Sequence, residues 1–231
     1  LFEDQFLPDE TIADTILAMQ KIAEEGMDEI IGEAAIHISK GAGNQNLIGN
    51  LICEAIIDYT DADFSFLNLG GVRDEIMAGP VSYRNVFNVM PFDNQIVMIE
   101  ADGKFLKDII ETRVSGSRHG LRVAGINVVI NRTRNNFDRV TKLIIKGEPW
   151  KADDIYKIAT TDFLLQGNAG LAMLTKVQES QITHYEQSLR DAIVEYIRSN
   201  SPVSTRIDDR WKRDDKSKIT PELQEELDKL K

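Results

Sequence analysis

Several common protein classes are excluded by what this sequence has little of. Its 231 residues include one cysteine, Cys53, so an internal disulfide is impossible; because Cys53 lies in an apolar run of helical periodicity, we expect a buried thiol. The 27 Lys and Arg are outnumbered by 38 Asp and Glu, and a net charge of −11 repels the backbone of a nucleic acid. No run is long and apolar enough to span a bilayer. We therefore expect no nucleic-acid partner and no membrane span.

Histidine is also scarce, and this bears on catalysis. His37, His119 and His184 stand apart, with none of the spacings typical of metal ligands. A two-metal phosphatase needs several such ligands around ions about 3.5–4 Å apart, so we expect no metal and no other cofactor in this chain. The sequence fixes no base beside the hydroxyls of Ser115-Gly116-Ser117, and we expect no catalytic residue.

The hydrophobic periodicity predicts short strands and helices in alternation around one main core, since 42% of the residues are hydrophobic. We expect helices over residues 9–26, 46–59, 83–90, 104–114 and 184–199, and strands over 29–38, 64–67, 95–101, 121–131, 139–146 and 155–160. Hairpin turns at Gly103 and Gly147 favour a mixed sheet with flanking helices, an α/β fold of the α+β type, over an all-parallel sheet.

The two ends of the chain differ from this middle. The helix expected over residues 9–26 is polar with one apolar stripe, formed by Ile12, Ile16, Met19 and either Ile22 or Ala23. After Pro202 the sequence becomes charged, and we expect residues 201–231 to form a surface extension with a last polar helix beginning at Thr220. The chain starts with Leu1-Phe2 and shows no signal peptide, and we expect that a leader or an upstream domain has been removed.

The most informative stretch is Asn68-Leu69-Gly70-Gly71-Val72-Arg73, which directly follows the apolar run of residues 64–67. Two glycines allow a ligand close to the backbone and permit φ > 0, and Arg73 offers a planar fork of donors for phosphate or carboxylate. Phe92, nineteen residues after Arg73, and Asn94 add an aromatic face and an amide that can read the edge of a base. Together these are typical of a nucleotide site, although a Gly-Gly turn followed by a solvated Arg is common.

Further blocks occur in order around this motif. They are Gly49-Asn50-Leu51-Ile52, Ala62-Asp63-Phe64, Ala78 to Val86, Pro91-Phe92-Asp93-Asn94, Gly103 to Lys107, Ile145 to Pro149, and Tyr156 to Leu164 followed by Gly167-Asn168-Ala169-Gly170. In their order and spacing they resemble the C-terminal, substrate-binding domain of the 5'-nucleotidase family, which includes periplasmic UDP-sugar hydrolases and ecto-5'-nucleotidases.

This resemblance implies a domain plan. Residues 1–28 would be a connector helix between domains, residues 29–200 the substrate-binding domain, and residues 201–231 a charged C-terminal extension outside the family core. In the family a separate N-terminal metallophosphatase domain carries divalent metals and hydrolyses the phosphate ester. That domain would be cut away or encoded as a separate subunit, so this chain alone is expected to be inactive. Periplasmic or extracellular localisation is implied as well.

The resemblance also implies the roles of individual residues. Phe92 and Phe163 match the two phenylalanines that hold the nucleobase between them, and Asn94 matches the amide at the base edge. Asn68 and Arg73 match residues that reach toward ribose and phosphate, with Gly70 and Gly71 between them; Asn168 and Gly170 belong to the loop that grips the ribose. Without the resemblance, either phenylalanine would be read as core, either asparagine as a turn residue, and the arginine as solvated.

Two departures from the family pattern keep other functions open. Ala169 stands where the family has a carboxylate that holds the ribose hydroxyls, and Asn50 lies in a helix where some members carry arginines. Losing a charged hydrogen bond costs about 1.5–3 kcal/mol. The alternatives are a degenerate, non-catalytic binding module of the same fold and an unrelated acidic domain. The sequence does not determine the native base, the phosphate count or the oligomeric state.

Overall fold

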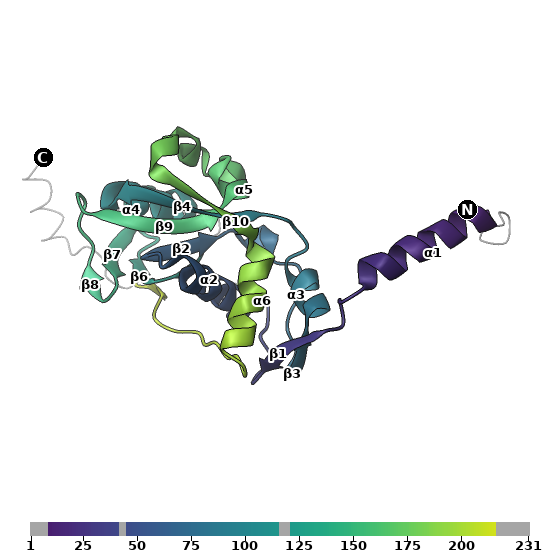
Figure 1. Ribbon diagram of the computed structural model, residues 1–231. Helices are drawn as coiled ribbons and strands as arrows, with labels where there is room; N and C mark the ends of the chain where they lie inside the picture. The colour runs from purple at the N-terminus through teal and green to yellow at the C-terminus, as the bar shows by residue number, and fades with distance from the viewer. Residues whose placement is uncertain (1–8, 42–44, 116–120, 216–231) are drawn as a thin grey trace, which may run out of the picture.

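A computed structural model describes residues 9–41, 45–115 and 121–215. Its central layer is a five-stranded sheet in the order β10-β4-β9-β2-β5 (Figure 1). The strands are β2 (Phe64–Leu67), β4 (Gln95–Asp102), β5 (Arg122–Ala124), β9 (Ile155–Thr161) and β10 (Ile182–Ser188). Strand β2 runs parallel to β9 while the other neighbours are antiparallel, which confirms the predicted mixed sheet.

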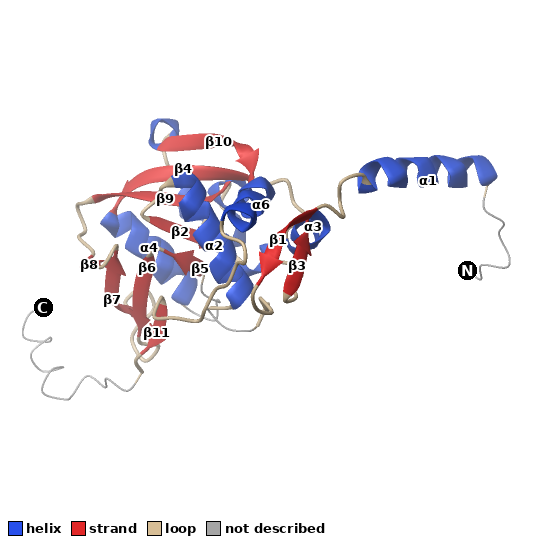
Figure 2. Ribbon diagram, turned by 60° about the horizontal axis from the view of Figure 1, so that its bottom comes forward, coloured by secondary structure: helices blue, strands red, loops and turns tan. Residues whose placement is uncertain are grey.

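Helices and further strands cover both faces of this sheet (Figure 2). Helices α2 (Leu47–Thr60) and α6 (Leu189–Ser199) bury their apolar sides against one face, near α3 (Tyr83–Val89) and the two-stranded sheet of β1 (Ile30–Ala34) and β3 (Gly79–Ser82). The other face packs on α4 (Gly103–Val114) and on a four-stranded sheet, β11-β6-β7-β8. Those strands are β6 (Ile126–Ile130), β7 (Val140–Ile145), β8 (Glu148–Pro149) and β11 (Trp211–Arg213).

Strand β2 shows why this sequence forms a central strand. All four of its residues are buried, as the continuous apolar run predicts for a strand covered on both faces. Phe64 and Phe66 face the core under α4, whereas the Ser65 hydroxyl points to α2 and donates to the Cys53 carbonyl at 2.7 Å. Cys53 itself is fully buried, as expected, and burial raises the pKa of its thiol to about 12.

Helix starts follow the capping signals of the sequence. The Asn46 side chain accepts a hydrogen bond from the Gly49 amide at 2.8 Å, and α2 begins at the next residue. Ser82 caps α3 as predicted, with a reciprocal bond from its own amide to the Asn85 side chain at 2.8 Å. The first helix, α1 (Glu10–Glu24), is capped by Asp9.

Three local predictions are wrong. The strand expected over residues 121–131 is two strands in different sheets, β5 and β6, because Gly125 adopts φ +78° and turns the chain between them. His184, expected in a helix, lies in β10, and α6 begins only after Ser188. Gly103 opens α4 instead of a hairpin, whereas Gly147, at φ +82°, does turn β7 into β8.

Residues 201–215 correct the expected C-terminal extension. Val203 is buried, and β11 pairs in parallel with β6, so this segment closes the second sheet. Arg210 is 7% exposed and donates to Glu54 at 2.6 Å, to Asp208 and to the Val123 carbonyl. These contacts make residues 201–215 part of the fold. The helix expected from Thr220 lies outside the described residues.

Helix α1 projects away from the rest of the molecule (Figure 1). Its predicted stripe is exposed to between 50% and 73%, at Ile12, Ile16, Met19 and Ile22. Arg84 anchors the segment after α1 by a hydrogen bond from its Nε to Asp28 at 2.7 Å, and this pairing holds the pKa of the Asp28 carboxyl below its ordinary value. In the part of the chain that the structure describes, no helix has the length and hydrophobicity to cross a membrane.

Candidate functional site

A cleft opens at the carboxyl end of β2, where the short turn of Leu69–Gly71 follows the strand. Its volume is about 320 Å³. The described residues that line it are Leu67, Asn68, Gly70, Gly71, Arg73, Met90, Phe92, Asn94 and Phe163. Seven of the nine residues singled out from the sequence therefore converge on one cavity, although they come from three separate parts of the chain.

The pairing of β4 with β9 brings two of these parts together. Ile96 near the start of β4 lies opposite Thr161 at the end of β9, so Asn94 just before β4 comes close to Phe163 just after β9. Phe163 is on the one-turn helix α5 (Asp162–Leu165). Its side chain is 39% exposed and that of Phe92 is 36% exposed, values unlike those of the core phenylalanines Phe64 and Phe66 at 0%. Two large apolar rings thus line a cleft that no described side chain fills.

Arg73 lies against one of these rings. Its guanidinium carbon is 5.2 Å from the centre of the Phe92 ring, within the range of a cation–π contact. The Arg73 backbone amide donates to the Val89 carbonyl at 2.9 Å, which ties the turn after β2 to the end of α3. The cation is thereby held at the rim, beside the face on which a planar group could stack.

Two features of the cleft leave room for a ligand: the turn at its floor has free space around Gly71, and two side-chain amides in its lining make no hydrogen bond among the described residues. A Cβ built on Gly71 would meet nothing nearer than Asn68 Oδ1 at 3.6 Å and Met90 Cε at 3.8 Å, so packing does not forbid a side chain there. Neither glycine of the turn has the positive φ that the sequence suggested; they keep the floor open instead. Within the described residues, the Asn68 and Asn94 side-chain amides make no hydrogen bond and remain available to a ligand.

Arg190 supports this arrangement and was not identified from the sequence. From α6 its guanidinium donates to the Met90 carbonyl at 3.1 Å, the Phe92 carbonyl at 3.2 Å and the Asp93 carboxylate at 2.8 Å. Burial lowers the Arg190 pKa, but hydrogen bonds with Tyr83 and Asp93 outweigh burial and leave that pKa raised. No local signal marks Arg190, because its partners lie about a hundred positions away in the chain.

Asn168 and Gly170 do not line the cleft. The Asn168 side chain donates to the Phe163 carbonyl at 2.8 Å, and the Ala169 carbonyl accepts a hydrogen bond from Arg113. Ala169 adopts φ 55° and Gly170 φ 78°, both in the left-handed region, so this short 3-10 turn (Asn168–Gly170) is tightly bent. The loop therefore braces the backbone of Phe163, and its side chains do not line the cavity.

Each histidine in the described residues pairs with a glutamate. His37 lies 2.8 Å from Glu75, and His184 lies 2.9 Å from Glu179, on exposed surface in both cases. Within residues 9–41, 45–115 and 121–215 there is no group of three or more His, Cys, Asp or Glu side chains placed to hold a metal ion. His119 and the preceding Gly116-Ser117 lie outside these ranges.

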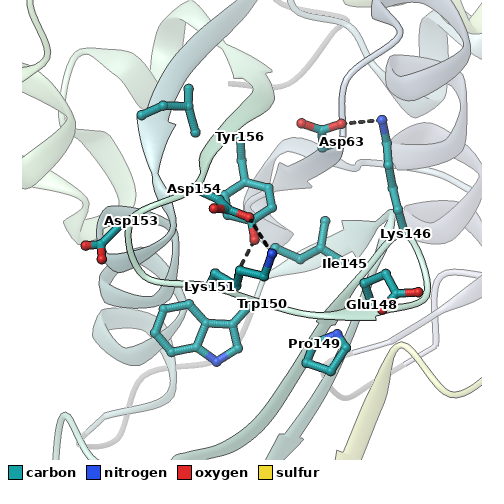
Figure 3. Close-up of a pocket in the computed structure, with 11 residues that line it drawn as sticks. Asp63, Ile145, Lys146, Glu148, Pro149, Trp150, Lys151, Asp153, Asp154 and Tyr156 are labelled. Atoms are coloured by element: carbon teal, nitrogen blue, oxygen red, sulfur yellow. Dashed lines mark hydrogen bonds and ion pairs between the residues drawn. The ribbon is translucent and has the colours of Figure 1, made fainter.

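A larger hollow of about 850 Å³ lies at the opposite end of β2, between the β7–β8 turn and the loop before β9 (Figure 3). Four of its charged groups form pairs: Lys146 with Asp63, and Lys151 with Asp154 at 3.5 Å. The Tyr156 hydroxyl accepts from the Lys151 amide at 3.0 Å. Most charged groups of this hollow are thus already paired, whereas the smaller cleft has two part-exposed rings and two side-chain amides without a hydrogen bond among the described residues.

The chain matches the family model described as "5'-nucleotidase, C-terminal domain" over residues 28–176. Protein UshA of Escherichia coli is 30% identical over 167 residues, covering 71% of this chain and 29% of that protein. Endonuclease YhcR of Bacillus subtilis is 32% identical over 110 residues, 47% of this chain and 9% of that protein. The chain thus spans less than a third of the length of these relatives. The crystal structure of a 5'-nucleotidase precursor from Thermus thermophilus superposes with a TM-score of 0.78 at 22% identity, over 89% of this chain and 44% of that one, and shows the same fold.

Proposed function

Because the chain belongs to the family of 5'-nucleotidase C-terminal domains, we propose that its cleft holds the base of a nucleoside or nucleotide between Phe92 and Phe163. The observation that supports this proposal best is the convergence of two part-exposed phenylalanines, two unbonded asparagine amides and one arginine on one cavity. Stacking of a base on an aromatic ring contributes about 1–3 kcal/mol.

The chemistry of each polar residue in the cleft suits it to a different part of the ligand. The Asn94 amide carries both a donor and an acceptor, which suits the edge of a base, and the Asn68 amide offers the same two groups elsewhere in the lining. Arg73 supplies the cation for a phosphate. Although the whole chain carries a net charge of −11, charges more than a Debye length of about 10 Å away are largely screened, so one local arginine suffices for a mononucleotide.

Hydrolysis of the phosphate ester belongs, in this proposal, to a metallophosphatase domain or subunit that carries divalent metals. Two-metal sites activate water and clamp the phosphoryl oxygens. The exposed stripe of α1 is the surface by which such a partner would be connected. Periplasmic or extracellular localisation and a role in nucleotide catabolism are part of the same proposal.

A degenerate binding module of the same fold is the second candidate, and Ala169 is the observation that favours it. The two candidates differ in what the cleft binds. The first requires that a nucleoside monophosphate binds more tightly than its nucleoside, since Arg73 adds a charged contact. The second is favoured when the phosphate contributes nothing.

Calorimetric titration of the chain with adenosine, AMP, uridine and UMP tests the proposal. We expect the monophosphates to bind more tightly than the nucleosides, and Arg73→Met to remove that difference, because the methionine keeps the apolar stem but not the charge. Absence of binding by every compound would refute the proposal.

Activity is tested on the same preparation. With added divalent metal we expect no release of phosphate from AMP. Turnover that is lost in a variant of this chain's own residues would show that the chain is catalytic, and a contaminating phosphatase would be unaffected by such a variant.

A further inference from the structure

We propose that the cleft recognises the base and not the hydroxyls of the sugar, so that ribonucleosides and 2'-deoxyribonucleosides bind with similar affinity. This inference rests on the proposed function and specifies its substrate class. It follows from the hydrogen-bonding groups that are free near Phe92 and Phe163, and from those that are already engaged.

The first observation concerns the lining itself. Among the described residues that form the cleft there is no Asp and no Glu. Two neighbouring hydroxyls of a ribose are gripped most strongly by a carboxylate, which accepts from both at once, and a hydrogen bond to a charged group is worth more than one between neutral groups. The cleft has a cation at its rim but no anion along its walls.

The carboxylates nearest to the two rings in the chain do not line the cleft, and each uses one oxygen to bind another group of the protein. Asp93, next to Phe92, accepts from the Arg190 guanidinium at 2.8 Å. Asp162, next to Phe163, uses its Oδ1 to accept from the Gln95 amide at 3.1 Å and from the Phe163 amide at 2.7 Å. Both therefore hold the backbone segments that carry the rings. Turning either carboxylate to a ligand would release those contacts.

The loop beside Phe163 offers no substitute. Its one polar side chain, Asn168, donates to the Phe163 carbonyl, and the carbonyl of Ala169 is taken by Arg113. The side chain of Ala169 is a methyl group, which neither donates nor accepts. The side-chain acceptor of this loop is Asn168 Oδ1, which is a neutral amide oxygen on a residue that does not line the cleft.

The groups that remain free are the Asn68 and Asn94 amides, the two rings and Arg73. The rings recognise a flat base of any sugar, and Arg73 recognises a phosphate. A neutral amide can contact a hydroxyl, but the loss of such a contact weakens binding much less than the loss of a carboxylate. The 2'-hydroxyl should therefore add little affinity.

Calorimetric titration of the wild-type chain with adenosine and with 2'-deoxyadenosine, in one buffer and at one salt concentration, tests this inference. We expect dissociation constants that differ by less than tenfold, a factor that corresponds to about 1.4 kcal/mol. Weaker binding of 2'-deoxyadenosine by tenfold or more would overturn the inference and leave the proposed function standing. Failure of both nucleosides to bind would overturn the proposed function together with the inference.

Two variants test whether either free amide contacts the 2'-hydroxyl of the sugar. Asn68→Ala and Asn94→Ala each remove one free amide from a part-exposed position, so the fold should tolerate both. We expect each variant to lower the affinities for adenosine and for 2'-deoxyadenosine by the same factor, because the lost contact would be to the base that both ligands share. If a variant lowers the affinity for adenosine alone, the replaced residue contacts the 2'-hydroxyl, and the inference is contradicted.

Discussion

Replacement of Phe92 by alanine separates a ligand-binding ring from a core ring. Full burial of a phenylalanine contributes about 1.5–3 kcal/mol, and the Phe92 side chain is 36% exposed, so about 1–2 kcal/mol of that stabilisation is at stake. The contact with the Arg73 guanidinium, 5.2 Å from the ring centre, adds about 0.5–1 kcal/mol. Phe92→Ala should thus cost about 1.5–3 kcal/mol of folding free energy. For a chain of 231 residues this is a fall in Tm of about 3–12 °C.

Binding should weaken by a free energy similar to the loss of stability. Loss of one stacking face costs about 1–3 kcal/mol, so the affinity for adenosine should fall about 5- to 150-fold. Calorimetric titration and a thermal melt on the same preparation of Phe92→Ala measure both quantities.

Two control variants bracket the result. Phe66→Ala removes a fully buried ring and should cost about 3–5 kcal/mol of stability. Phe137→Ala removes a ring that is 65% exposed and does not line the cleft, so affinity should be unchanged. Unchanged affinity of Phe92→Ala for adenosine, with a fall in Tm as large as that of Phe66→Ala, would refute the clamp and show Phe92 to be a core residue.

Three further outcomes are expected. Gly71→Ala should melt like the wild type, because its Cβ meets no atom closer than 3.6 Å, yet bind adenosine about tenfold more weakly since the methyl group enters the cleft; equal affinity would show that the turn does not approach the ligand. Cys53, with a pKa of about 12, should resist iodoacetamide at pH 8 until the chain is unfolded, as mass spectrometry can follow. Arg210→Ala should lower stability by about 3 kcal/mol, the lower end of the cost of breaking a buried pair, because Glu54 and Asp208 are each 28% exposed. The control Arg198→Ala, which breaks an exposed pair, should cost at most about 1 kcal/mol in the same urea titration.

Several features of the fold follow from the sequence because their causes are local. The apolar run at β2 is buried on both faces, and Asn46 and Ser82 cap their helices through residues within three positions. Seven residues of the cleft could be named from one short motif and one family resemblance, whereas Leu67 and Met90 were not named. Their convergence was then a consequence of strand pairing, which places the ends of β4 and β9 together.

Other features depend on contacts that no local pattern contains. Residues 121–131 are mostly apolar and read as one strand, but a side chain at position 125 would meet the Asp63 carbonyl at 2.2 Å, and the chain turns there at Gly125 into a second sheet. Strand β10 is mostly exposed and is held by its pairing with β4. The charge of the segment after Pro202 predicts a surface extension. Arg210 of this segment instead pairs with Glu54 of α2, which lies 156 positions away in the chain.

The sequence by itself determined the family, the mixed fold and seven of the cleft residues, because each rests on residue types and short spacings along the chain. Only the tertiary structure decided which polar groups are free. Asp93, Asp162 and Asn168 are as polar as Asn68 and Asn94 in the sequence, yet the first three are bound to Arg190 or to backbone groups. Hydrogen-bond capacity is a property of the residue, but its availability depends on neighbours that folding brings from far away in the chain.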